Sequence, residues 1–112
     1  MPYKPYVPKS LSELYDFLGF MMLASPTFKD RTGFLRHQNL DNAFLSLNES
    51  LLALRDKLGE ERYATLSGIS AKMRPLFEAD PDDVTGDTRR GQKLIREMEE
   101  ILKGALKRKA TN

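Results

Sequence analysis

The sequence predicts an all-α protein, a four-helix antiparallel bundle with an extended N-terminal arm and a long loop between the first two helices. Three observations support this fold class. Apolar residues recur at spacings of three and four in four separate segments, good capping residues flank these segments, and no stretch shows the alternation of a strand. We therefore divide the chain into an arm, residues 1–9, and a single helical domain, residues 10–112.

The arm and the first helix are separated by a clear start signal. Prolines at positions 2, 5 and 8 predict an extended arm, because proline fixes its own φ and disfavours helix in the preceding residue. Ser10 and Glu13 then form the S-x-x-E pattern of a capping box. The helix should end near Ser25-Pro26, and residues 17–23 make it apolar nearly all round. Such a helix is either enclosed or pressed against a partner.

The second helix has the clearest periodicity in the chain. Residues 26–40 contain Pro26 and Gly33 and no sustained period, so we expect a long connection there. Asp41 is the expected N-cap, and Leu40 and Leu45 have the spacing of a hydrophobic staple. Gly59 should end this helix in the left-handed region, and the short turn then forces an antiparallel hairpin.

The third and fourth helices flank an acidic loop. The third should run from about Glu60 to Ala79, and Pro75 should bend its last turn or end the regular helix. Asp87 or Thr88 is expected to cap the fourth helix. The inward positions of all four helices define one predicted core: Leu14, Leu18, Leu47, Leu51, Leu54, Leu66, Met73, Ile95, Met98 and Leu102.

Composition restricts the class of protein. A chain of 112 residues with 40% apolar and 30% charged residues fits one globular domain. Cysteine is absent, which is typical of a reducing compartment, and the N-terminal segment has no apolar core of a secretory signal. The longest apolar run, residues 17–24, is too short to span a bilayer. We expect a cytoplasmic protein without a membrane-embedded segment.

Residue types that carry chemistry are scarce. His37 is the one histidine, and it has neither cysteine nor a second histidine at metal-ligand spacing. The acidic stretch from Asp80 to Asp87 does not match the spacing of a calcium loop, since glycine is missing from the sixth position in either register. Neither a phosphate-binding glycine loop nor a G-x-S-x-G element is present. We predict no enzyme activity, no metal, no cofactor and no small-molecule ligand.

Nucleic-acid binding is the alternative function. Basic residues gather on the predicted fourth helix and the tail, namely Arg89, Arg90, Lys93, Lys103, Lys107 and Arg108. A basic helix can follow phosphates, but Glu97, Glu99 and Glu100 interrupt the run and the formal net charge is only +2. Any such binding should be weak, non-specific and sensitive to salt. A solvated charged face is the favoured interpretation.

Protein binding is therefore the predicted function. Small helical proteins that lack catalytic or ligand-binding motifs include bacterial immunity proteins, antitoxins and inhibitors, which occlude a partner protein. The comparison is an analogy between classes of protein. The residues expected to contact the partner are those that the fold has difficulty burying: Tyr3, Tyr6, Phe20, Met22, Phe28 and Phe34. Two alternatives remain open, since the apolar first helix also suits a homodimer, and the arm and the 26–40 connection could cover it instead.

Overall fold

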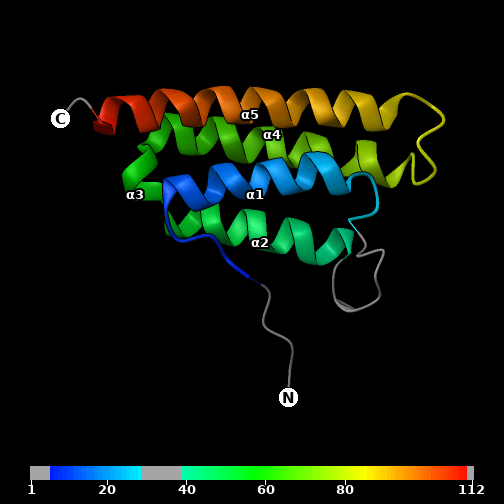
Figure 1. The fold of residues 1–112 in the computed structure, drawn as a ribbon, viewed down its shortest axis with the longest axis horizontal. Coiled ribbons are helices and arrows are strands. Elements are labelled where there is room, and N and C mark those ends of the chain that lie inside the picture. The colour runs from blue at the N-terminus through cyan, green and yellow to red at the C-terminus, as the bar shows by residue number, and fades with distance from the viewer. Residues whose placement is uncertain (1–5, 29–38, 111–112) are drawn as a thin grey trace, which may run out of the picture.

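The computed structural model describes residues 6–28 and 39–110, and this part of the chain is all-helical (Figure 1). Its helices are α1 Leu11–Ala24, α2 Leu40–Ala53, α3 Arg55–Leu58, α4 Glu60–Glu78 and α5 Asp87–Ala110. No strand occurs among the described residues. The all-α class is thus confirmed, with five helices where the periodicity predicted four.

Helix α1 begins and ends where the sequence predicts. Ser10 is the N-cap, and its Oγ accepts a hydrogen bond from the Glu13 amide at 3.1 Å. The Glu13 carboxylate reaches one residue further back than in a standard capping box and accepts from the Lys9 amide at 2.8 Å. The helix ends at Ala24, directly before Ser25-Pro26.

The predicted start of α2 is wrong by two residues. Asn39 is the N-cap, and its Oδ1 accepts from the Asn42 amide at 2.9 Å. Asp41 therefore lies in the first turn, where its carboxylate is free to pair with Arg74 of α4. The expected staple residue Leu45 is exposed. With Asn39 as the cap, the fourth position inside the helix is Ala43, which is buried.

The helix that was predicted to run unbroken to Leu58 is interrupted at Leu54. This residue leaves the helical region, with φ −98° and ψ 7°, and the four-residue α3 follows. Gly59 then has φ +86° and ψ 155°: its φ is positive, as the sequence predicts, but its ψ lies outside the left-handed helical region, and α4 starts at once. Across this turn Arg55 holds Glu60 through two hydrogen bonds of 2.7 and 2.8 Å.

The bounds of α4 agree with expectation, whereas the start of α5 differs from it. Helix α4 runs from Glu60 to Glu78, and Pro75 lies inside it without ending it. Neither Asp87 nor Thr88 caps α5: Asp87 is its first residue, and its amide donates to Thr85 Oγ1 at 3.3 Å. The Thr88 amide donates instead to Asp80 at 3.0 Å.

The four long helices lie side by side and each runs opposite to the neighbours that it contacts (Figure 1). Helix α5 packs on α4 and α1, and α2 packs on α4 and α1, so that the core lies between all four. Every residue of the predicted core is buried. The helical periodicity therefore identified the inward faces correctly, although it did not give all the helix ends.

Candidate protein-binding surface

The arm preceding α1 is attached to two helices. Pro8 is buried, and its carbonyl accepts a hydrogen bond of 2.7 Å from Ser50 Oγ of α2. The Lys9 amide is held by Glu13 of α1. Both contacts involve backbone groups, so Pro8 and Lys9 are fixed in place, while the Tyr6 side chain remains 57% exposed.

An aromatic row continues from the arm along α1. The ring centroids of Tyr6 and Phe17 are 6.2 Å apart, and those of Phe17 and Phe20 are 5.5 Å apart. Phe17 is buried and Phe20 is half-buried against the core. Tyr6 thus covers one side of Phe17, and the exposed parts of Tyr6 and Phe20 flank the buried ring.

Leu23 extends this row at the end of α1. Its side chain is 86% exposed, the highest value among the large apolar residues of the described chain. Residues three apart in a helix share a face, so Leu23 lies beside Phe20. We call Tyr6, Phe20 and Leu23 the α1 surface. Single exposed leucines are common on protein surfaces, whereas a set of three neighbouring apolar side chains is less common.

The rim of the α1 surface is acidic. Glu13 and Asp16 are exposed on the same side of α1 as Phe20, given their spacing. Partial burial, together with the charge and hydrogen bond of Glu13 and the charge of Asp16, raises the pKa of the Tyr6 phenol above its usual value. A tyrosine phenol is neutral at physiological pH even at its usual pKa, so Tyr6 presents a hydrogen-bonding group within an apolar surface.

The remaining predicted contact residues have different positions. Phe28 is fully buried between the rings of Phe44 and Phe77, so it belongs to the core and not to a binding surface. Met22 is half-buried against the core. Tyr3 and Phe34 lie outside the described residues. Leu23 was absent from the predicted set, although it falls in the stretch of α1 that is apolar all round.

The basic residues predicted for nucleic acid lie on α5. Arg89, Arg90, Lys93, Lys103 and Lys107 are all exposed. Arg90 pairs with Asp87 at 2.6 Å, and Lys103 pairs with Glu100 at 3.2 Å. Position 108 is on α5, but its side chain lies outside the described part.

Few other features of the described residues could hold a ligand. No cluster of three or more histidine, cysteine or acidic side chains suited to a metal occurs among them, and His37 lies outside them. A shallow groove of roughly 600 Å3 separates the start of α4 from α5. Its charged lining comprises Glu60, Glu61, Arg62 and Glu100, and Glu60 is already occupied by Arg55.

Comparison with known proteins gives no relative: no family model, no curated protein and no solved structure matches this chain. Within residues 6–28 and 39–110, no helix has the length and apolarity needed to cross a bilayer. The surfaces described above are thus the basis for any assignment of function.

Proposed function

We propose that this chain is a non-catalytic protein-binding module, an antiparallel four-helix bundle that occludes a partner protein through the α1 surface. The observation that carries the proposal is the exposure of Tyr6 and Leu23 on either side of the half-buried Phe20, with Tyr6 and Phe20 both in ring contact with the buried Phe17. Aromatic and large aliphatic groups at the centre of a polar rim are typical of interface cores. The immunity, antitoxin and inhibitor proteins of bacteria are the functional class that we favour, in a cytoplasmic setting.

The acidic rim indicates the kind of partner. Glu13 and Asp16 stand beside the α1 surface, so a matching surface should place basic side chains around an apolar centre. Rim charges mainly speed association and select partners, whereas the apolar centre supplies most of the affinity. We expect Leu23 to contribute most, because it has the largest exposed fraction to lose on binding.

The test compares Leu23→Ser with Val84→Ser. Both Leu23 and Val84 are strongly exposed in the free protein, at 86% and 80%, but Val84 lies in the loop before α5. A partner recovered from native lysate by the wild-type chain should bind Val84→Ser equally and Leu23→Ser at least about tenfold more weakly, with both melting temperatures unchanged. Equal binding by the two variants would refute the α1 surface as the binding site.

Self-association is the competing use of the same surface. Sedimentation of the purified wild-type chain separates the two cases. If the protein is a dimer that Leu23→Ser converts to a monomer, the occupant is a second copy of this chain. A monomer at all concentrations leaves a different protein as the expected occupant.

A further inference from the structure

One side of α5 carries a row of basic residues along most of its length. Arg89, Lys93, Arg96, Lys103 and Lys107 are separated by four, three, seven and four positions, a spacing that places them on one face of a helix. All five are exposed, while Ile95, Met98 and Leu102 are buried on the opposite side. We call these five residues the α5 basic stripe.

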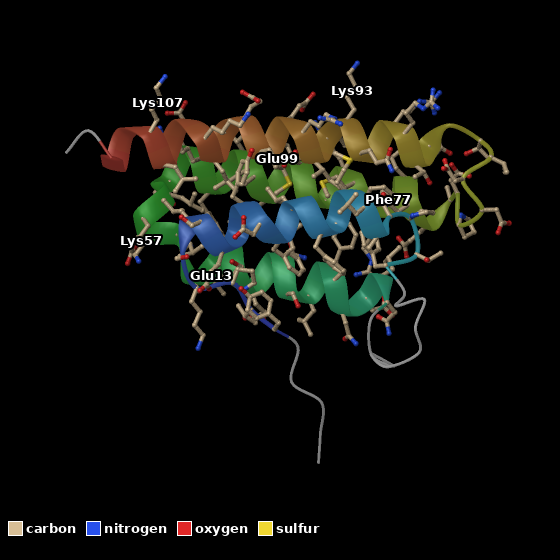
Figure 2. The ribbon with its side chains drawn as sticks, in the orientation of Figure 1. Glu13, Lys57, Phe77, Lys93, Glu99 and Lys107 are labelled. Atoms are coloured by element: carbon tan, nitrogen blue, oxygen red, sulfur yellow. The ribbon has the colours of Figure 1, made fainter. Side chains whose placement is uncertain are left out.

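Figure 2 shows the direction of this face. The side chains of Lys93 and Lys107 point the same way, outward from the other helices, although 14 positions separate them along α5. At 1.5 Å per residue the stripe from Arg89 to Lys107 is about 27 Å long. Its basic groups therefore form an extended line and not a compact cluster.

Most of these cations have no internal counter-ion. Within the described residues, Lys103 pairs with Glu100, whereas Arg89, Lys93, Arg96 and Lys107 make no ion pair. Glu97 and Glu100 are the exposed acids on this part of the helix. The face consequently has an excess of positive charge that the fold leaves for the solvent or for a ligand.

The composition of the face restricts what it can bind. Between positions 89 and 107 the exposed residues of α5 are charged, apart from Gly104. No exposed apolar group is present there to enter a lipid layer or to form the centre of a protein interface. This face also has no exposed aromatic side chain on which unpaired bases could stack, so single-stranded nucleic acid is a disfavoured ligand.

A regular polyanion is the ligand that remains. We propose that the α5 basic stripe binds the phosphate backbone of double-stranded nucleic acid without sequence preference. Lysine and arginine contacts to phosphates supply affinity by releasing counter-ions, and they carry no information about the bases. This site is separate from the α1 surface and does not depend on the protein-binding proposal.

The direct test measures binding of the full chain to a fluorescent DNA duplex by anisotropy at several salt concentrations. Binding should be measurable at about 50 mM salt and nearly lost at about 200 mM. A plot of log affinity against log salt should be linear, with a slope no steeper than about −4.5, since each of five phosphate contacts contributes about −0.9. Scrambling the duplex sequence should not change the affinity.

Two double variants with the same change in net charge identify the site. Lys93 and Lys107 replaced by glutamate (K93E/K107E) should lower the affinity at about 50 mM salt by at least about tenfold and flatten the slope by about 2. Lys9 lies on the arm and Lys57 on α3, so the variant in which both are replaced by glutamate (K9E/K57E) should retain most of the binding. Circular dichroism melts show whether each variant is folded. Leu23→Ser, which alters the α1 surface, should bind the duplex normally.

Several results would overturn the proposal. Equal losses in K93E/K107E and K9E/K57E would show that net charge alone is responsible, and absence of binding at low salt would exclude the site. Vesicles containing phosphatidylserine and a polyglutamate peptide serve as competing anions. If either binds the stripe as well as the duplex does, the ligand is a lipid headgroup or an acidic protein, and the nucleic-acid assignment fails.

Discussion

At the scale of single residues, Asp80 organises the loop between α4 and α5. Its side chain is buried, and its carboxylate accepts hydrogen bonds from the amides of Val84, Thr85 and Thr88 at 2.7, 3.0 and 3.0 Å. Thr88 Oγ1 donates in turn to the Asp80 carbonyl oxygen at 2.9 Å. Burial by itself would raise the pKa of this carboxyl group, but the hydrogen bonds outweigh it and hold the pKa well below its usual range.

Replacing Asp80 with asparagine should destabilise the protein, and the loss should depend on pH. The amide group would place a donor against a backbone N–H and would remove the negative charge that these bonds stabilise. Because the folded pKa is depressed, an unfolded chain takes up the proton first, at a pKa of about 3.9. The contribution of Asp80 is therefore complete above about pH 5 and declines as the pH falls through about 4 and below.

Urea denaturation from about pH 6 to about pH 2.5 measures this effect. The difference in unfolding free energy between the wild type and Asp80→Asn should narrow as the pH falls, since the other carboxylates are common to both. Asp82→Asn is the matched control, because Asp82 is exposed in the same loop and should change stability little. A difference that stays constant over this range would contradict a depressed pKa for Asp80.

At the scale of helices, the sequence predicted periodic features better than ends. The apolar spacing of each long helix depends on its own residues, which explains why the buried faces were predicted correctly. Asn39 is the N-cap, and Asp41 pairs instead with Arg74 of α4, a partner that local sequence does not reveal. Likewise, neither glycine nor proline marks the break at Leu54 in the sequence. Leu54 also fits the apolar periodicity of the core and is buried, so the spacing gives no sign of a break.

The packing of α4 on α5 depends on a position without a side chain. A Cβ added at Gly91 would lie 2.6 Å from two ring carbons of Phe77, a ring that is already enclosed by Phe28 and Phe44. Gly91→Ala should therefore destabilise the protein. Overpacking costs about 1–3 kcal/mol, and the gain in helix propensity of up to about 1 kcal/mol offsets only part of it.

Gly104→Ala provides the control on the same helix. Nothing lies within 4 Å of a Cβ added at Gly104, and the residue is exposed, so helix propensity should act alone and stabilise by up to about 1 kcal/mol. Thermal melts of the two variants should shift in opposite directions. A stabilised Gly91→Ala would mean that the Phe77 ring has room to move, and the close packing of α4 and α5 would not be a constraint.

At the scale of the whole molecule, the surplus of apolar residues in α1 is divided between core, arm and solvent. The sequence predicted that α1 has more apolar residues than one face can bury, but it did not predict which of them are buried. Burial depends on which distant segment covers each residue. Phe28 is covered by Phe44 of α2 and Phe77 of α4, whereas Leu23 is covered by no described segment. The candidate site was thus predicted only in part, with Tyr6 and Phe20 retained and Phe28 assigned to the core.

Phe28 therefore connects the segment after α1 to the common core, and its loss should weaken the whole fold. Its ring is fully buried and lies edge-on to Phe44 and Phe77, at centroid distances of 5.9 and 5.3 Å. We expect Phe28→Ala to lower the unfolding free energy by about 3–5 kcal/mol, as for other buried phenylalanines. Alanine keeps the Cβ at a backbone with φ 59°, so the difference reports loss of the ring and not relief of the left-handed conformation.

Leu23→Ala, five residues earlier and largely exposed, should change stability by less than about 0.5 kcal/mol. Urea midpoints followed by circular dichroism decide the matter: equal midpoints for the two variants would place Phe28 outside the cooperative core and return it to the set of surface residues available to a partner.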